Sequence, residues 1–234
     1  MKKLLFILML TAAAAQASLR TETFTYNVGS PIPDGLSLAD VQNSPFTINN
    51  IFDMRVTLDV AGAPIGTGGG FNGDLYVQLS HGSGTSVLLN RPGRYLATPA
   101  FNPVGFDDGG LVFVFSDSAA VNAHDYRAPG AGTPGAQVTG TFQPDGRTQN
   151  PLLVNGDVDA PNPTASLLGA FGTENPNGNW NLLLVDNQFG TGNMALTSWT
   201  LSVTGIVPEP GTVALFAVIM GILPVVRRRR TRQA

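Results

Sequence analysis

The sequence predicts an all-β fold, a single antiparallel, jelly-roll-like β-sandwich of about eight strands within residues 18–207. Two observations lead to this prediction. Apolar and polar residues alternate in several short stretches, which is the period of a half-buried strand, and 28 glycines and 17 prolines among 234 residues supply many turns. The chain has no cysteine, so no disulfide holds the domain together and no thiol serves as nucleophile or metal ligand.

The first 17 residues have the pattern of a secretory signal peptide. Met1-Lys2-Lys3 precedes an uncharged run from Leu4 to Leu10, and Ala15-Gln16-Ala17 is a small-x-small cleavage site. The alternative is a buried amino-terminal helix, which the two lysines and the Ala-Gln-Ala site disfavour. The mature chain is therefore expected to begin at Ser18.

Two early stretches alternate clearly. Thr23–Val28 places Phe24, Tyr26 and Val28 on one face. The strand is expected to end at residues 30–35 (SPIPDG), because proline cannot continue a ladder and Asp-Gly is a turn signal. Ile51–Val60 is a second alternating strand that ends at Ala61-Gly62.

The middle of the chain mixes strands with irregular insertions. Leu111–Phe115 is an apolar run short enough for a strand buried on both faces. The Gly/Pro-rich segment 128–136 and the polar segment 155–163 show no periodicity and are predicted loops.

Residues 177–203 hold both tryptophans and close the domain. Trp180 and Trp199 each precede apolar residues typical of strands, and residues 186–193 (DNQFGTGN) between them favour a turn. We therefore expect a hairpin-like pair with a long polar loop, in which both tryptophans are largely buried.

Several motifs resemble the P domain (P/Homo B), the β-sandwich that follows the catalytic domain of subtilisin-like proprotein convertases. They are Asn177–Leu182, Asp186 and Trp199–Leu201 at the end of the domain, Gly73–Leu75 with Leu79, Gly82–Thr85 and Val87–Leu89 in the middle, and Ile32–Asp34 near its beginning. The resemblance covers residues 23–205. It implies a β-sandwich that, in convertases, stabilises a neighbouring protease. This chain contains no protease, and the histidine that often precedes the Gly-Asp-Leu motif is missing here.

The tail after Val207 changes composition abruptly. Pro208-Glu209-Pro210 precedes an uncharged segment, residues 211–226, which spans about 24 Å as a helix at roughly 1.5 Å per residue. A cluster of arginines follows: Arg227, Arg228, Arg229 and Arg230. Such a cluster keeps the carboxyl side of a transmembrane helix in the cytoplasm.

This three-part tail resembles the PEP-CTERM sorting signal of Gram-negative bacteria. The resemblance implies that exosortase, a membrane protease-transpeptidase, cleaves near Pro208–Pro210. It also implies export across the inner membrane, a transient membrane anchor, and release to the cell surface or outside the cell. The alternative is a plain tail anchor, which gives no reason for the Pro-Glu-Pro motif.

The charge of the predicted domain limits its partners. Residues 18–207 hold six of the thirteen basic residues and fifteen of the sixteen acidic ones, a net charge of about −9. Nucleic acid is therefore not expected as a partner, because phosphate binding needs a basic face. One interpretation of the negative charge is that it keeps the protein soluble. A more specific interpretation is a calcium site, because calcium binds carboxylate oxygens from loops. The candidate ligands are Asp74, Asp107, Asp108 and Asp186.

The sequence predicts no enzyme and no catalytic residue. His81 and His124 are the two histidines, and neither lies in a protease or zinc motif, so each is interpreted as a solvated loop residue. Acidic pairs such as Asp107-Asp108 could serve a glycosidase, but turns use such pairs more often. Asp107-Asp108 also matches the Phe-Asp-Asp segment of the P domain, which is not catalytic there.

Three functions remain open. The first is an exported, non-enzymatic surface or extracellular-matrix protein, processed by exosortase and associated with exopolysaccharide or biofilm. The second is a carbohydrate- or calcium-binding adhesion module, which would place aromatic side chains on an exposed face. Tyr76, Tyr95, Phe101 and Tyr126 are the candidates, although core packing is the expected role of each. The third is a hydrolase, or an accessory domain of one, with an unrecognised site.

Overall fold

The computed structural model describes residues 18–62, 70–96, 101–127, 135–156, 158–189 and 194–207. One compact unit runs from Leu19 to Ile206. The predicted signal peptide, the motif Pro208–Pro210, the apolar segment 211–226 and the arginines 227–230 lie outside the described residues. Within the described ranges, no helix has both the length and the apolar character needed to cross a membrane.

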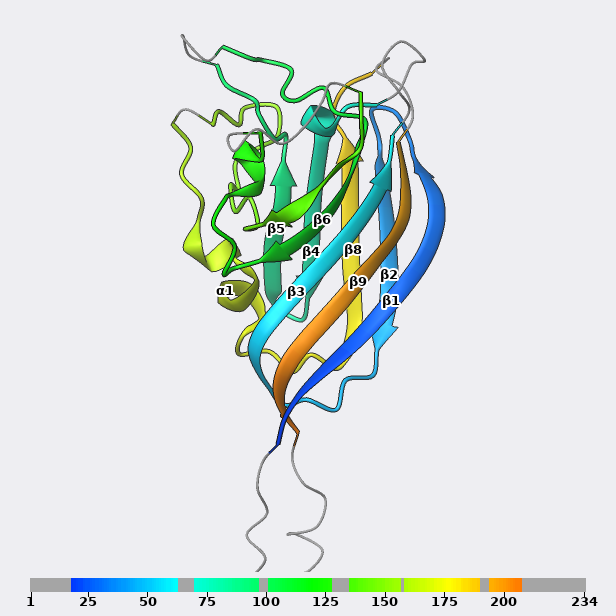
Figure 1. Cartoon of the computed structure of the whole chain (residues 1–234), viewed down its shortest axis with the longest axis vertical. Helices are drawn as coiled ribbons and strands as arrows, with labels where there is room; N and C mark the ends of the chain where they lie inside the picture. The colour runs from blue at the N-terminus through cyan, green and yellow to red at the C-terminus, as the bar shows by residue number, and fades with distance from the viewer. Residues whose placement is uncertain are drawn as a thin grey trace, which may run out of the picture. The chain divides into compact units, whose positions relative to one another are not determined.

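The described residues form nine strands in two sheets, which face each other in two layers (Figure 1). One sheet has the order β1-β9-β3-β6-β7 and the other the order β2-β8-β4-β5. The chain crosses repeatedly between the sheets, and of the described strands only β4–β5 and β6–β7 follow one another within the same sheet. The all-β prediction is confirmed. The strands are β1 (Ser18–Ile32), β2 (Ser37–Ser44), β3 (Asn50–Ala61), β4 (Leu75–His81), β5 (Gly84–Asn90), β6 (Gly110–Ser116), β7 (Val138–Phe142), β8 (Gly178–Asp186) and β9 (Met194–Val207).

The two tryptophans anchor the core from opposite sheets. Trp180 on β8 and Trp199 on β9 are both fully buried, as predicted. The predicted hairpin is wrong, because β8 pairs with β2 and β4, whereas β9 pairs with β3 and lies next to β1. Each of the two strands has a neighbour on both sides that is distant in sequence. The polar loop between β8 and β9 therefore connects one sheet to the other.

One edge of the larger sheet departs from the antiparallel pattern. β6 and β7 pair in parallel, with Leu111 opposite Val138 and Phe115 opposite Phe142. The long connection between them allows a parallel crossover. The predicted strand Leu111–Phe115 is confirmed, but its burial on both faces is not: Val112 and Val114 are only half-buried, because they face away from the core.

β1 is much longer than the predicted strand Thr23–Val28. It continues beyond Val28 to Ile32 because β1 is an edge strand, on which Pro31 can turn away from the ladder. Hydroxyl pairs join it to β9: Thr21–Thr204 at 2.7 Å, Thr23–Ser202 at 3.1 Å and Thr25–Thr200 at 2.9 Å. The antiparallel register brings the beginning of β1 and the end of β9 to the same end of the domain (Figure 1).

The long segment between β7 and β8 covers the edge of β5. The backbone N–H groups of Asp145 and Gly146 donate to the carbonyls of Leu88 and Val87, each at 3.0 Å, which protects an otherwise open strand edge. Four short helices lie in the described parts of the connections: η1 (Asn72–Asp74), η2 (Ala123–Asp125), η3 (Pro163–Ala165) and α1 (Leu167–Phe171). The described part of residues 155–162 is irregular, as predicted for residues 155–163, but Pro163 already belongs to η3.

Candidate functional site

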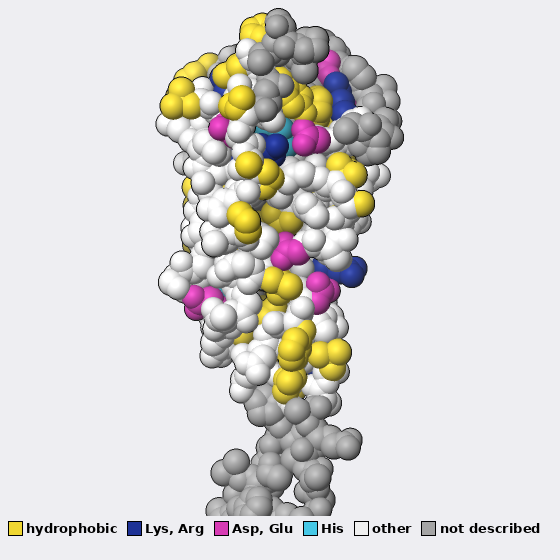
Figure 2. Space-filling model, turned by 90° about the vertical axis from the view of Figure 1, so that its left-hand side faces the viewer, with side chains coloured by type: hydrophobic (Ala, Val, Ile, Leu, Met, Phe, Trp, Pro, Cys, Tyr) yellow, Lys and Arg dark blue, Asp and Glu magenta, His cyan; other side chains and the backbone are white. Residues whose placement is uncertain are grey.

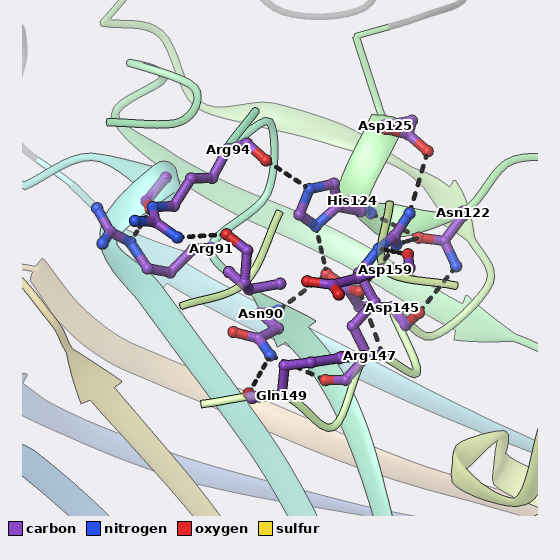
Figure 3. Close-up of polar contacts among 12 residues, drawn as sticks. Asn90, Arg91, Arg94, Asn122, His124, Asp125, Asp145, Arg147, Gln149 and Asp159 are labelled. Carbon is purple, nitrogen blue, oxygen red and sulfur yellow. Dashed lines mark hydrogen bonds and ion pairs between the residues drawn. The ribbon is translucent and has the colours of Figure 1, made fainter. Parts of the chain in front are cut away.

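A buried polar network lies where three connections meet beyond the end of β5 (Figure 3). It includes Arg94 from the segment after β5, His124 from η2, and Asp145 and Arg147 from the segment after β7. All four residues are at most 9% exposed. Polar groups buried to this extent are stable only if their hydrogen bonds are made within the protein.

Asp145 is the centre of this network. Its Oδ2 accepts from the backbone N–H of Asn90 and lies 3.0 Å from Nδ1 of His124. Its Oδ1 accepts from Nη1 of Arg147 at 3.0 Å. The carboxylate is completely buried, and these charge-assisted donors replace the water that it loses.

Arg94 joins two further segments to the network. Its Nε donates to the carbonyl of Pro103 at 3.1 Å, and its Nη2 donates to the carbonyl of Leu152 at 3.1 Å. Its Nη1 donates to the carbonyl of Val154. Burial lowers the pKa of Arg94 from its usual value, and the three carbonyls offset that desolvation.

Arg147 and Asn122 fix the opposite side. Nε of Arg147 donates to the carbonyl of Asp159 at 2.8 Å, and its Nη1 donates to Oδ1 of Asn122 at 3.1 Å. Nδ2 of Asn122 donates to the carbonyl of Pro144 at 2.8 Å. The described part of segment 144–159 is therefore held by these side-chain hydrogen bonds as well as by the backbone bonds of Asp145 and Gly146 to β5.

The His124–Asp145 pair has the geometry of a catalytic dyad but no access to a substrate. Both side chains are 0% exposed, and a Cβ placed on Gly156 would lie 2.6 Å from Nε2 of His124. The prediction that His124 is a solvated loop residue is wrong, because a carboxylate 21 residues away compensates its burial. In this arrangement, the pair positions loops.

His81 is also buried, contrary to the sequence interpretation. It ends β4 and is 8% exposed. Nδ1 lies 2.8 Å from the carbonyl oxygen of Asn179, and Nε2 lies 2.7 Å from that of Asn175. These contacts attach the segment before β8 to the end of β4.

The structure separates the four candidate calcium ligands into two pairs. Asp74 and Asp186 adjoin one another, since Leu75 pairs with Asp186, and both are almost completely buried. Nη2 of Arg91 lies 3.4 Å from Oδ1 of Asp74. Burial raises the pKa of Asp186; the backbone N–H of Gln188 and the charge of Arg91 oppose this rise, whereas the charge of Asp34 adds to it.

The other pair, Asp107 and Asp108, is bound by one guanidinium. Arg127 contacts Asp107 at 2.5 Å and Asp108 at 2.9 Å, and these bonds raise the pKa of Arg127 although burial lowers it. Asp108 also accepts from the hydroxyl of Tyr126 at 2.5 Å. Across the described part of the chain, no group of three or more His, Asp or Glu side chains has an arrangement that could hold a metal ion.

The four aromatic candidates for carbohydrate binding do not form one exposed platform. Tyr126 is fully buried and packs on Phe106 and Phe113, so it has the core role that the sequence favoured and is no part of an exposed face. Tyr76 and Tyr95 are half-buried and donate their hydroxyls to Gln78 and Asp125. Phe101 is exposed, at 59%.

Exposed apolar side chains lie on the segments that Arg94 holds together. The set is Leu96, Phe101, Val104, Leu152 and Leu153, with exposed fractions between 37% and 71%. Figure 2 shows hydrophobic side chains at this end of the molecule. The buried network thus supports a surface that is partly apolar.

The sequence interpretation missed the network because its members are scattered over residues 90–159. One signal was present: four of the six arginines in residues 18–207 fall between positions 91 and 147. Cations this concentrated in an acidic domain indicate buried carboxylates that need partners.

Comparison with solved structures gives a distant likeness. No family model matches the sequence, and no curated protein matches it either. A similar solved structure is the crystal structure of the complex of Aeromonas sobria serine protease (ASP) and the chaperone ORF2, with a TM-score of 0.41 and 13% identity. The match covers 81% of this chain and 27% of the matched chain. A likeness this distant indicates no function.

Proposed function

We propose that this chain is an exported, non-enzymatic β-sandwich protein of the cell surface or extracellular matrix, associated with extracellular polysaccharide. Residues 1–17 direct export across the inner membrane of a Gram-negative bacterium. Residues 208–234 hold the chain in that membrane until exosortase cleaves near Pro208–Pro210. The sandwich is a P-domain-like module that acts without an attached protease.

The boundary between domain and tail is the observation that carries this proposal. The compact unit ends at Ile206, and β9 ends at Val207, directly before Pro208. Cleavage at or after the Pro-Glu-Pro motif would therefore leave every described strand intact. Prolines at positions 208 and 210 also disfavour helix, so this segment suits the extended conformation that a protease cleft requires.

The environment of the two histidines supports a non-enzymatic role. His124 is completely buried against Asp145, and both ring nitrogens of His81 contact backbone carbonyls. Both histidines thus have structural roles in the folded domain.

Intact-mass analysis of the protein from its native host tests the sorting proposal. We expect the mature protein to begin near Ser18, to end near the Pro-Glu-Pro motif and to lack Arg227–Arg230. Deletion of the exosortase gene should retain the tail, and so should Glu209→Ala in the normal host. Asp53→Asn, an exposed change on β3, is the matched control and should be processed normally. If the tail persists equally in both hosts, residues 208–234 are only a membrane anchor and the sorting proposal is wrong.

A further inference from the structure

A pocket of about 310 Å³ lies between the end of β6, the end of β7 and the segment before α1. Small-molecule sites span roughly 300–1,000 Å³, so this pocket suits a small ligand or one unit of a polymer. Its lining combines polar and proline side chains: Asp117, Asn122, Gln143, Pro144, Pro161 and Asn162.

Hydrogen bonds fix the walls of this pocket in advance. The carboxylate of Asp117 accepts from the backbone N–H groups of Leu167 and Leu168, at 2.9 and 2.7 Å. Nε2 of Gln143 donates to the carbonyl of Ala119 at 2.8 Å. The backbone N–H of Asn162 donates to the carbonyl of Gly146 at 2.8 Å. A ligand would therefore meet a preformed site and would not need to order these segments.

Three side chains in the pocket keep hydrogen-bonding capacity. Each carboxylate oxygen of Asp117 accepts one N–H and can accept another. Gln143 uses its nitrogen toward Ala119, which leaves its Oε1 as an acceptor. Asn162 uses Oδ1 to accept from Thr164, and its Nδ2 has no partner among the described residues. Acceptors and a donor thus line the same pocket, which is a combination that the hydroxyl groups of a sugar can satisfy.

Apolar surface completes the lining. The pyrrolidine rings of Pro144, Pro161 and Pro163 contribute C–H faces beside the polar groups. Gly146 has a φ of +69°, and a Cβ there would lie 3.3 Å from Cβ of Pro161, on the pocket wall. Glycine at this position therefore keeps space open that a side chain would fill.

We propose that this pocket binds one neutral sugar residue of a glycan. Sugar hydroxyls would donate to Asp117 and Gln143 and accept from Asn162, and the C–H face of the ring would pack on the prolines. Asp117 and the net charge of about −9 on residues 18–207 disfavour anionic sugars. This inference rests on the proposed association with polysaccharide and names its contact residues, which differ from the aromatic candidates.

Titration of the 15N-labelled mature protein with single sugars tests the site by NMR. The probes are glucose, galactose, mannose and N-acetylglucosamine, with glucuronate as the anionic comparison. At least one neutral sugar should give saturable shifts confined to the amides of residues 117–122, 143–146 and 161–166. No saturable shift with any neutral sugar, equal binding of glucuronate, or shifts centred on Phe101 would overturn the proposal.

Two variants test the named contacts. Asp117→Asn removes the charge and one acceptor, and we expect at least tenfold weaker binding. Asn162→Asp keeps the oxygen that accepts from Thr164 but replaces the free donor, so it should weaken binding similarly without loss of fold. Asp53→Asn removes the same charge on distant β3 and should bind like the wild type. Unchanged affinity in Asn162→Asp would contradict the assignment even if Asp117→Asn failed to fold.

The sugar titration and the sorting experiment fail independently. Exosortase processing is measured on the tail in the native host, whereas sugar binding is measured on the purified mature protein. A processed protein that binds no sugar would leave the sorting proposal intact, and an unprocessed one that binds sugar would leave the site intact.

Discussion

The imidazole ring of His81 lies parallel to the indole ring of Trp180, with ring centroids 4.2 Å apart and an interplanar angle of 10°. Nε1 of Trp180 donates to the carbonyl of Pro176 at 2.9 Å, and His81 contacts the carbonyls of Asn175 and Asn179. Two stacked rings therefore bind three carbonyls of one short segment and set the point at which β8 begins.

Replacement of His81 separates stacking from hydrogen bonding. His81→Phe keeps an aromatic ring on Trp180 but loses both carbonyl contacts, and we expect a loss of about 1–3 kcal/mol in the free energy of unfolding. His81→Ala also loses the stack and should cost more. Urea unfolding measures both, with Ser80→Ala on the same strand as control. Equal stability of His81→Phe and wild type would show that the carbonyl contacts contribute nothing.

Asp145 should be among the most sensitive positions in the domain. Asp145→Asn leaves His124 and Arg147 buried without their carboxylate, and removal of one member of a buried ion pair costs roughly 3–5 kcal/mol. Asp125→Asn is the matched control, because the Asp125 side chain is 35% exposed and lies 3.9 Å from Arg147. Surface ion pairs contribute about 0–1 kcal/mol. Similar losses in the two variants, measured by urea unfolding, would contradict a central role for Asp145.

The raised pKa of Asp186 predicts a pH-dependent effect of its replacement. A carboxyl group whose pKa is raised by folding binds its proton more tightly in the folded protein. The stabilisation that this bound proton gives is fully present below the pKa that Asp186 has in the unfolded chain. It is lost as the pH rises through the pKa that Asp186 has in the folded protein. Asp186→Asn, measured in EDTA, should therefore gain stability relative to wild type between about pH 3.5 and about pH 7.

Urea unfolding at both pH values measures this gain. Oδ1 of an asparagine can still accept from the N–H of Gln188, as Asp186 does at 3.1 Å. Asp53→Asn provides the comparison, since Asp53 is 43% exposed. A gain that is the same at both pH values would show that the charge of Asp186 is not the cause.

Calcium binding at the acidic residues remains a prediction from the sequence. Of the four candidates, Asp74 and Asp186 adjoin one another, whereas Arg127 binds Asp107 and Asp108. The prediction requires millimolar calcium to raise the melting temperature of the mature protein above its value in EDTA. It also requires a smaller rise in Asp186→Asn. Equal melting temperatures with calcium and with EDTA would show that the prediction of a calcium site is wrong.

Local sequence patterns predicted the strands but not their partners. Alternation located β3 within one residue at each end, and the apolar residues after Trp180 and Trp199 located β8 and β9. The pairing of β8 with β2 and β4 depends on residues far apart in the chain, and no local pattern carries that information. A turn-rich loop therefore suggested a hairpin that the structure does not contain.

Burial of the polar residues was hidden from the sequence for a similar reason. His81 precedes Gly82 and Ser83, which is typical of an exposed turn, yet its partner Asn179 is 98 residues away. The burial of His124 is compensated by its contact with Asp145. Whether a polar side chain can be buried depends on such distant partners, and these become visible only when the strands have been assembled.

The position of β9 between two other strands has a mechanical consequence. A protein held at a surface through its carboxyl end would receive every external pull along β9, which lies between β1 and β3. Such a force acts parallel to the strand. The hydrogen bonds on both sides of β9 would therefore have to break together and not one after another. β1 begins at the end of the domain where β9 ends, and its amino-terminal end would carry none of the load. Attachment through β9 would therefore resist a pulling force better than attachment through an edge strand.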